Sequence, residues 1–346
     1  MDVRAYAVLE EKAPLTPWNF TRRDLGAGDV AIEIEFSGVC HSDIHTARSE
    51  WGDITFPCVP GHEIVGRVSG LGESASKFQV GQRVGVGVYV DSCRTCKNCL
   101  SGMTNYCEEG FTGTYNTPER SGDGITQGGY ATGIVVNEDY VVSVPESLDP
   151  AAAAPLLCAG ITLYSPLKKF GAGPGVKVGI VGLGGLGHMG VKYAVAMGAE
   201  VTVFSHSESK REDALAMGAH HFVVTKDETV FTTHAKEFSL VINTVSAPLD
   251  LNLYLELLEL DGTLVMVGIA PEPYAIKAFS VLLQRRRIAG STIGPVSELQ
   301  EMLDFSAEHN IVSDIEVINA DYLNEAWDRV VESDVRYRFV IDASTI

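Results

Sequence analysis

Apolar and polar positions alternate over short stretches in the chain up to about residue 145. Residues 30–36 alternate with a period of two, which is the pattern of a strand with one buried face. Residues 65–68 and 84–88 continue this pattern, and Gly, Pro and Asp separate the stretches. The pattern predicts a β-rich domain in this part of the chain.

The pattern changes between about residues 150 and 290, where buried-strand candidates alternate with helical stretches. The strand candidates cover residues 176–181, 201–204, 240–243 and 263–267. Alternation at this pitch is typical of a parallel, doubly wound sheet with helices on both faces.

The last part of the chain, from about residue 295, mixes both patterns. It contains an amphipathic helix, a strand near 315–318, a further helix and a closing strand over 337–341. We expect this tail to rejoin the N-terminal domain. The predicted architecture is therefore α/β, with a β-rich domain of residues 1–148 and 290–346 and a doubly wound domain of residues 149–289.

Length and composition fit a folded protein of two domains. The 346 residues are 45% hydrophobic and 21% charged. Lys and Arg number 26 against 45 Asp and Glu, and the net charge of −19 argues against nucleic acid or anionic membranes as partners. The N-terminal residues lack the pattern of a signal peptide, and the longest apolar run, 151–157, is short and contains Pro155. A cytoplasmic protein is expected, in which thiols stay available for metals.

Four cysteines lie close together in the β-rich part of the chain. Cys93, Cys96, Cys99 and Cys107 have the spacing C-x2-C-x2-C-x7-C. Four thiolates with no open position predict a structural zinc ion. Two alternatives are an iron–sulfur cluster, which closely spaced cysteines also bind, and a set of unliganded surface thiols.

A second group of metal-binding residue types is spread along the sequence. Cys40, His62 and Cys158 give a Cys2His set, which is typical of a catalytic zinc that keeps its fourth position for substrate or water. Each residue alone has a plainer interpretation, since a lone cysteine or histidine is usually part of the core. The remaining cysteine, Cys58, is interpreted as a core thiol.

A glycine-rich turn follows the first strand of the predicted doubly wound domain. Gly182, Gly184 and Gly187 form G-x-G-x-x-G between a strand and a helix, where the backbone binds a dinucleotide pyrophosphate. At the end of the next strand, Ser205 occupies the position where NAD-binding sites carry an acidic residue. Ser207, Lys210 and Arg211 follow and are suited to a 2′-phosphate, which predicts NADP(H) rather than NAD(H). Ser207 can also serve as a helix N-cap.

Several motifs occur in an order that resembles a known family. They are Gly38-Val39-Cys40-His41-Ser42-Asp43, Pro60-Gly61-His62-Glu63, the four-cysteine loop, residues 155–160, the glycine turn and the ending 334–342. With these motifs the chain resembles the zinc-containing medium-chain alcohol dehydrogenases, in the cinnamyl-alcohol-dehydrogenase branch, and is similar to bacterial NADPH-dependent aldehyde reductases. The resemblance implies a GroES-like catalytic domain, a Rossmann domain and two zinc ions per subunit, one catalytic and one structural.

The resemblance also implies roles for single residues. Cys40, His62 and Cys158 hold the catalytic zinc, Glu63 reaches it when the substrate site is empty, and Asp43 orients His62. Ser42 and His45 pass the proton. The implied cofactor contacts are His41, Thr162, Gly182, Leu183, Gly184, Gly185, Leu186, Gly187, Ser205, Ser207, Lys210, Arg211, Thr244, Val267, Gly268, Ile269 and Ser291. The implied substrate pocket contains Trp51, Thr114, Tyr115 and Ile293.

The implied reaction is the interconversion of primary alcohols and aldehydes by hydride transfer. Plant relatives in this branch carry Trp-Ser-Tyr-Asn where this chain has Gly113-Thr114-Tyr115-Asn116, so a broad aliphatic and aromatic range, including cinnamyl-type substrates, is expected. The alternatives are a polyol or secondary-alcohol dehydrogenase of the same fold and a non-catalytic nucleotide-binding protein. A zinc-free quinone reductase would lack the four-cysteine loop and Cys158. Pairing of residues 279–293 across a two-fold axis implies a homodimer, with a tetramer as the alternative, and the run 285–287 of three arginines is expected to be solvated or ion-paired.

Overall fold

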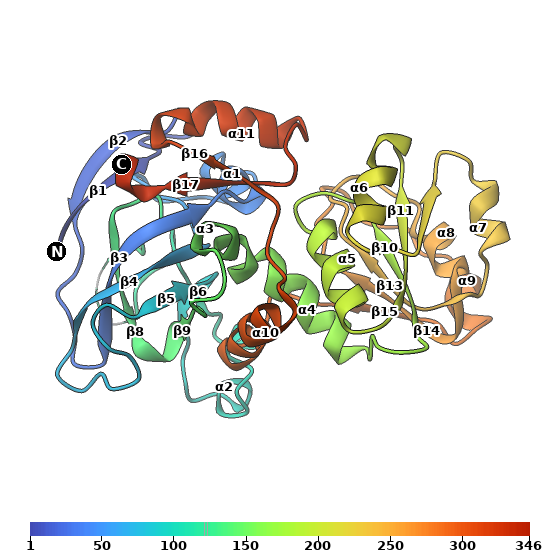
Figure 1. Cartoon of the computed structure of the whole chain (residues 1–346), viewed down its shortest axis with the longest axis horizontal. Coiled ribbons are helices and arrows are strands. Elements are labelled where there is room, and N and C mark those ends of the chain that lie inside the picture. Colours follow the sequence, from blue (N-terminus) through green and yellow to red (C-terminus); the bar gives the residue numbers. More distant parts are fainter. Residues whose placement is uncertain (121, 123) are drawn as a thin grey trace. The chain divides into compact units, whose positions relative to one another are not determined.

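The computed structural model describes residues 1–120, 122 and 124–346. The chain forms two compact units, Met1–Ile161 with Gly294–Ile346 and Thr162–Ile293 (Figure 1). These boundaries differ from the predicted 148/149 and 289/290. Residues 149–161 group with the first unit because helix α3 (Pro150–Ala153) packs against strands β3 (Asp29–Gly38) and β4 (Ile64–Leu71). Gly290 is the last residue of β15 (Arg287–Gly290), which is the last strand of the second unit. Residues 291–293 follow this strand and belong to the same unit.

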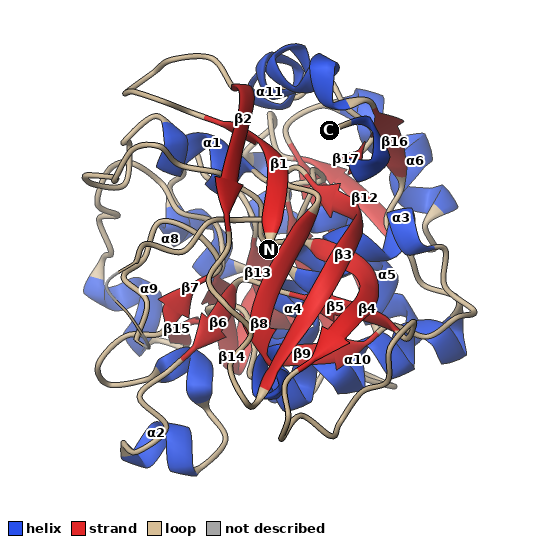
Figure 2. Cartoon of the chain, turned by 90° about the vertical axis from the view of Figure 1, so that its left-hand side faces the viewer, coloured by secondary structure: helices blue, strands red, loops and turns tan. Residues whose placement is uncertain are grey.

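The first unit is built around a seven-stranded sheet with the order β16-β17-β3-β4-β5-β9, in which β8 also pairs with β3. Figure 2 shows β3, β4, β5 and β9 side by side. Besides β3 and β4, this sheet contains β5 (Arg83–Val86), β8 (Gly133–Asn137), β9 (Val141–Ser143), β16 (Ile315–Ile318) and β17 (Arg338–Asp342). The predicted strand over 30–36 lies inside β3, where Val30, Ile32 and Ile34 are buried.

Smaller elements complete the first unit. They are β1 (Asp2–Ala7) paired with β2 (Thr16–Thr21), β6 (Tyr89–Asp91) paired with β7 (Thr112–Gly113), α1 (His41–Ala47), α2 (Lys97–Leu100), α10 (Val296–His309) and α11 (Leu323–Val331). Helix α11 buries Leu323, Ala326, Trp327 and Val330, which share one helix face and pack in a core with Tyr130 and Phe339. Val39 and Ile44 belong to this core, so the core supports the segment that carries Cys40.

The second unit is a six-stranded parallel sheet with the order β12-β11-β10-β13-β14-β15. Numbered from its own first strand, this order is 3-2-1-4-5-6, the doubly wound order that binds dinucleotides at the point where the strand order reverses. The strands are β10 (Lys177–Val181), β11 (Glu200–Ser205), β12 (His221–Val224), β13 (Phe238–Asn243), β14 (Leu258–Met266) and β15 (Arg287–Gly290). The helices are α4 (Ala159–Lys169), which begins in the first unit, α5 (Gly187–Ala196), α6 (Arg211–Ala216), α7 (Thr229–Thr233), α8 (Leu251–Glu256) and α9 (Ala278–Leu282). All four predicted strands are confirmed.

Two of the three consecutive arginines near β15 lie in different environments. Arg285 is exposed and paired with Asp261, as expected. Arg286 is buried instead and donates to the carbonyl oxygens of Leu258, Ser280 and Glu256. Burial lowers the pKa of Arg286, and the three carbonyl oxygens satisfy its guanidinium.

Among the described residues, no single helix combines the length and hydropathy of a membrane span. Only a bent pair, Pro150–Leu157 with Ala159–Lys169, meets that criterion jointly.

Candidate active site and metal centres

Three separate segments of the first unit bring Cys40, His62, Glu63 and Cys158 together. Cys40 directly precedes α1, His62 and Glu63 directly precede β4, and Cys158 lies just before α4. All four are buried, and one ligand atom from each lies within 4.8 Å of those of the other three. The set expected from the sequence therefore forms one cluster.

The surroundings of His62 fit a metal ion. Its Nδ1 lies 2.9 Å from Asp43 Oδ1, so the carboxylate holds the ring as the Nδ1–H tautomer. Its Nε2 is buried, and no described residue offers it a hydrogen bond. An Nε2 lone pair that faces two cysteine sulfurs and lacks a partner is what a Cys2His metal site requires.

Asp43 fixes the geometry of this cluster through four hydrogen bonds. Besides His62, it accepts from the backbone N–H of Gly61 at 3.1 Å and of Cys40 at 3.0 Å, and from the hydroxyl of Tyr130 at 3.0 Å. The carboxylate is fully buried and thus joins three segments that are distant in sequence. The sequence analysis did not identify Tyr130.

The electrostatics of the cluster favour an anionic sulfur. A hydrogen bond from Cys158, followed by the influence of His62, lowers the pKa of Cys40 well below the usual thiol value, although burial opposes the shift. Burial raises the pKa of Glu63 to about 7, and Arg338 opposes this shift. A thiolate is the form of cysteine that binds a metal.

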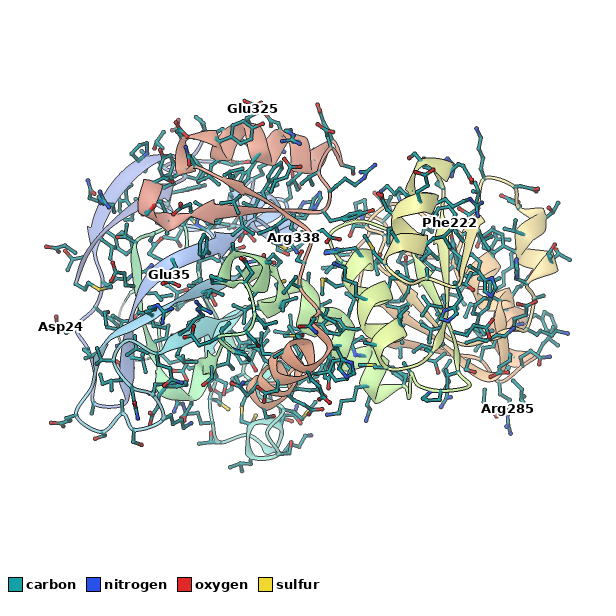
Figure 3. All side chains as sticks on the ribbon, viewed as in Figure 1. Asp24, Glu35, Phe222, Arg285, Glu325 and Arg338 are labelled. Atoms are coloured by element: carbon teal, nitrogen blue, oxygen red, sulfur yellow. The ribbon has the colours of Figure 1, made fainter. Side chains whose placement is uncertain are left out.

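Arg338 is a further residue that the sequence analysis missed. It is the first residue of β17 and is labelled in Figure 3. Its guanidinium is buried, donates twice to the carbonyl oxygen of Val39, and donates to Glu63 Oε1 at 2.6 Å. Antiparallel pairing of β17 with β3 brings Arg338 beside Val39 despite their separation in sequence.

Helix α1 carries the residues expected to move protons. Ser42 Oγ lies 3.6 Å from Cys40 Sγ. Three residues further along the helix, His45 is partly exposed, and its Nδ1 pairs with Glu50. The His45 ring stacks on Trp51 with centroids 4.9 Å apart. The centroid of the His41 ring lies 5.9 Å from that of the His45 ring. Glu50 was not predicted from the sequence, although it lies within the same segment.

The expected pocket residues differ in their environments. The Tyr115 ring stacks on His62 at 5.9 Å between centroids, which places it beside the metal ligands. Thr114 is buried, and its hydroxyl donates to the carbonyl oxygen of Gly87. Trp51 is exposed beside His45. Ile293 ends the second unit, with a positive φ of 41°.

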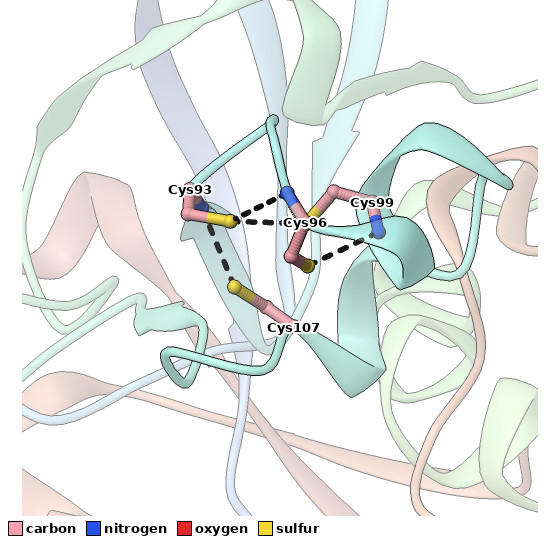
Figure 4. A group of neighbouring side chains, drawn as sticks. All are labelled: Cys93, Cys96, Cys99 and Cys107. Carbon is pink, nitrogen blue, oxygen red and sulfur yellow. Dashed lines mark hydrogen bonds between the residues drawn. The ribbon is translucent and has the colours of Figure 1, made fainter.

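The four-cysteine loop forms a second cluster, drawn in Figure 4. Cys93, Cys96, Cys99 and Cys107 each place a sulfur within 4.8 Å of the other three. The backbone N–H groups of Cys96 and Cys99 donate to the sulfurs of Cys93 and Cys96 at 3.3 and 3.4 Å. Such bonds, chiefly from Cys96 and Thr95, lower the pKa of Cys93 to about 6. A closed set of four sulfurs with N–H donors fits a structural zinc ion.

Cys58 lies outside both clusters. It is 1% exposed, and its backbone pairs with that of Val8. Burial raises the pKa of its thiol to about 12, so the thiol stays protonated at physiological pH. This environment agrees with a core thiol.

In the second unit, the glycine turn follows β10 and leads into α5. Gly182 has a φ of 88°, which favours glycine, and a side chain at Gly187 would meet the carbonyl oxygen of Gly182 at 2.1 Å. A side chain at Gly184 would meet none of the described atoms within 4 Å, so the backbone there is open to a ligand. Leu183, Gly185 and Leu186 complete the turn. These features are those of a pyrophosphate-binding turn.

The loop after β11 has the features expected for an NADP(H) site, with one exception. Ser205, buried at the end of β11, exchanges hydrogen bonds with the backbone of Ser207. Lys210 donates to the carbonyl oxygen of Leu183 at 2.8 Å, which brings its ammonium group to the glycine turn. Arg211 instead pairs with Glu208 and donates to the carbonyl oxygen of Phe222. Its guanidinium is therefore held by protein groups.

The remaining expected cofactor contacts lie near the carboxyl ends of the strands, apart from Thr162, which is buried in α4. Thr244 follows β13, and its hydroxyl donates to the carbonyl oxygen of Val181, at the reversal point between β10 and β13. Val267, Gly268 and Ile269 follow β14, and Ser291 follows β15. Gly268 is required there, since a side chain would lie 2.4 Å from the carbonyl oxygen of Val245.

A glycine turn at the reversal point of a parallel sheet and a buried Cys2His cluster define a class. Together they are typical of metal-dependent oxidoreductases that use a dinucleotide. In an enzyme of this class, a bound dinucleotide would carry the hydride, and a metal ion held by the Cys2His cluster would polarise the substrate.

Comparisons with known proteins identify the family within this class. Residues 26–146 match the family model of the alcohol dehydrogenase GroES-like domain, and residues 185–308 match that of zinc-binding dehydrogenases. The chain is 54% identical to NADP-dependent alcohol dehydrogenase C 1 of Mycolicibacterium smegmatis, over 99% of both chains. It is 51% identical to the aldehyde reductase YahK of Escherichia coli, over 100% of this chain and 99% of that one.

A solved structure extends the likeness to the fold. The crystal structure of a cinnamyl alcohol dehydrogenase from Helicobacter pylori, complexed with NADP(H), superposes with a TM-score of 0.93 at 40% identity and covers 99% of this chain and 98% of that one. The chain belongs to the family of zinc-binding alcohol dehydrogenases with a GroES-like domain. The expected fold class, a GroES-like domain with a Rossmann domain, is confirmed.

Proposed function

We propose that this chain is a zinc-dependent, NADP(H)-preferring alcohol dehydrogenase that interconverts aldehydes and primary alcohols. The observation that carries the proposal is the buried cluster of Cys40, His62 and Cys158, in which His62 Nε2 has no partner among the described residues. The relatives named as NADP-dependent alcohol dehydrogenase and aldehyde reductase support the same reaction.

The two metal ions have different roles in this proposal. Cys40, His62 and Cys158 would hold the catalytic zinc, and Cys93, Cys96, Cys99 and Cys107 the structural zinc. When bound, the catalytic ion polarises the substrate carbonyl as a Lewis acid, and the nicotinamide supplies the hydride. Asp43 keeps the imidazole of His62 in the orientation that this requires.

Proton transfer is assigned to the face of α1 that carries Ser42 and His45. During aldehyde reduction, the Ser42 hydroxyl delivers a proton toward the substrate oxygen, and His45 restores it from solvent. The position of Ser42 beside Cys40 and the partial exposure of His45 support these roles. Glu50 pairs with His45 Nδ1 and so holds the imidazole in place on this face of α1.

The preference for NADP(H) rests on Ser205 and Lys210. Ser205 leaves room for a 2′-phosphate where a carboxylate would repel it, and Lys210 lies at the glycine turn. Gly113 adds no side chain two residues before Tyr115, which supports a broad aliphatic and aromatic range of substrates.

Initial rates of benzaldehyde reduction test this proposal. We expect a strong preference for NADPH over NADH, loss of activity after treatment with a zinc chelator, and recovery on addition of zinc. A secondary alcohol and a polyol serve as comparison substrates and should be poorer. Equal rates with NADH would refute the assignment of Ser205 and Lys210, and turnover without metal would refute the catalytic zinc.

We further propose that the chain is a cytoplasmic homodimer that pairs through strand β15. This strand is an edge of its sheet, and Phe279, Leu282 and Leu283 nearby are exposed by 72%, 66% and 69%. An open strand edge beside exposed apolar side chains is typical of a two-fold interface. None of the seven cysteines is paired in a disulfide, which fits a reducing compartment.

Sedimentation equilibrium tests the dimer. Wild type is expected at twice the monomer mass, and Leu282→Glu should shift the equilibrium toward monomer because the interface would bury an unpaired carboxylate. Leu215→Glu, at an exposed leucine of α6 in the same unit, is the matched control and should leave the mass unchanged. A monomeric wild type, or a Leu282→Glu variant that stays dimeric, would count against this interface.

A further inference from the structure

The four-cysteine loop begins beside a buried hydroxyl group that reaches one of its sulfurs. Ser92 directly follows β6 and precedes Cys93, and its side chain is buried. Its Oγ lies 3.2 Å from Cys99 Sγ, which is within hydrogen-bond distance for sulfur. A zinc-bound cysteine is a thiolate and carries no proton to donate. With zinc in the loop, the Ser92 hydroxyl is therefore the donor and the Cys99 sulfur is the acceptor.

A second buried hydroxyl continues this contact into the domain. Tyr140 Oη lies 2.8 Å from Ser92 Oγ, and Tyr140 is 3% exposed. Because Ser92 gives its proton to the sulfur, its oxygen accepts from Tyr140, and both hydrogen bonds then point toward Cys99. Tyr140 directly precedes β9 of the seven-stranded sheet. Ser92 and Tyr140, which we call the hydroxyl pair, thus connect a metal ligand to the sheet of the first unit.

The other three sulfurs accept hydrogen bonds from inside the loop. The backbone N–H groups of Cys96, Cys99 and Cys93 donate to the sulfurs of Cys93, Cys96 and Cys107 at 3.3, 3.4 and 3.4 Å (Figure 4). These bonds move together with the loop, because donor and acceptor both belong to it. The hydroxyl pair differs, because its second member belongs to another segment of the domain.

The ring of Tyr140 is itself held from two sides. It packs edge-on against the ring of Tyr89 with centroids 5.7 Å apart, and the guanidinium of Arg94 lies 5.2 Å from its centroid. Arg94 also pairs with Asp91 at 3.0 Å and with Asp139 at 2.8 Å. Since Arg94 belongs to the four-cysteine loop, the loop packs on the same tyrosine that supplies the second hydroxyl.

We propose that the hydroxyl pair anchors the structural zinc ion to the sheet through a hydrogen bond to the Cys99 thiolate. Ser92 and Tyr140 are thus positioning residues that fix one ligand and slow the escape of the ion. Hydrogen bonds from outside the ligand set orient the ligands and raise metal affinity. The inference rests on the structural zinc site of the proposed function.

Ser92→Ala and Tyr140→Phe test the pair one hydroxyl at a time. The first readout is the rate at which the full-length enzyme transfers zinc to a chromophoric chelator. Cys40→Ala, which lacks a ligand of the other cluster, identifies the phase of release that belongs to the loop. We expect the loop to release zinc about 10- to 100-fold faster in Ser92→Ala. Tyr140→Phe should release it about 5-fold faster, as expected for the loss of one neutral hydrogen bond.

The second readout separates a hydrogen bond to sulfur from general support of the fold. It is the sulfur-to-cobalt charge-transfer band of enzyme in which cobalt(II) replaces zinc, recorded in the Cys40→Ala background so that the loop alone contributes. A hydrogen bond to a thiolate lowers the energy of the sulfur lone pair, so its loss should shift the band to longer wavelength. We expect this shift in Ser92→Ala and a smaller shift in the same direction in Tyr140→Phe.

Tyr89→Phe is the matched control. It also removes a buried tyrosine hydroxyl that bonds to the loop, since Tyr89 Oη lies 2.9 Å from Thr104 Oγ1. Its partner is a threonine rather than a metal ligand. The rate of zinc release and the cobalt band of this variant should therefore match those of the unsubstituted protein.

Each outcome separates the hydroxyl pair from the zinc site itself. An unshifted band in Ser92→Ala, or equal acceleration of zinc release in Tyr89→Phe and Tyr140→Phe, would overturn the role of the pair. Should Ser92→Ala fail to fold, Tyr140→Phe loses a single oxygen atom, and an unshifted band in that variant would overturn it. Equal metal content in Cys40→Ala with and without Cys99→Ala would instead overturn the structural zinc site.

Discussion

Replacement of Cys40 by alanine is expected to reduce the bound zinc from two ions per chain to one and to abolish most activity. The variant removes one of three ligands from a buried site, and the remaining pair, His62 and Cys158, cannot hold the ion in competition with water and chelators. Loss of Lewis-acid stabilisation is worth several kcal/mol, so kcat/KM for aldehyde reduction should fall by at least about 10³-fold. Metal analysis and initial rates measure the two effects.

Cys58→Ala is the matched control for this experiment. Cys58 is also a buried thiol of the first unit but belongs to neither cluster. The control should keep both zinc ions and kinetics close to those of wild type, with some loss of thermal stability from the cavity. A Cys40→Ala enzyme that keeps both ions and its activity would show that the Cys40 cluster is not the catalytic site.

The elements that the sequence predicted are those with a local signal. The glycine turn is visible in six consecutive residues, because Gly182 has a positive φ of 88° and a side chain at Gly187 would meet the carbonyl oxygen of Gly182. The four-cysteine loop likewise spans 15 residues from Cys93 to Cys107, and its sulfurs converge as expected. Alternation of strands and helices predicted the parallel sheet for the same reason.

The residues that the sequence did not reveal act across long separations. Arg338 reaches Glu63 only because β17 pairs with β3, and Tyr130 reaches Asp43 only because its segment pairs with residues 59–61. No periodicity marks such contacts, since each is a single hydrogen bond between distant segments. Arg211 shows the opposite case, because its ion pair with Glu208, three residues before it, is a local contact.

The predicted domain boundary at 148/149 differs from the observed one for a related reason, which lies in helix α3. Its apolar sequence fits a doubly wound domain as well as a β-rich one, and only its packing against β3 and β4 assigns it to the first unit. Cys158 is thereby placed in the same unit as Cys40 and His62. The three proposed ligands consequently share one compact scaffold, which suits a site whose geometry must be fixed before substrate binds.

Replacement of Ser205 by aspartate is expected to reverse the preference for the cofactor. The side chain is buried at the end of β11, where an acidic group can accept from a ribose diol but repels a 2′-phosphate. A hydrogen bond to a charged group contributes about 1.5–3 kcal/mol, so its loss together with repulsion should lower kcat/KM for NADPH by about 100-fold. The value for NADH should stay constant or rise.

Two further variants show whether an effect of Ser205→Asp comes from the phosphate site. Thr233→Asp adds the same charge at an exposed position of helix α7 in the same unit and should leave the ratio of NADPH to NADH rates unchanged. Lys210→Ala removes the ammonium group at the glycine turn and should weaken NADPH alone. If Ser205→Asp lowers the rates with both cofactors equally, the residue supports the fold of the β11 loop rather than selecting the phosphate. A selective loss with NADPH in both variants would mean that the 2′-phosphate lies between Ser205 and Lys210.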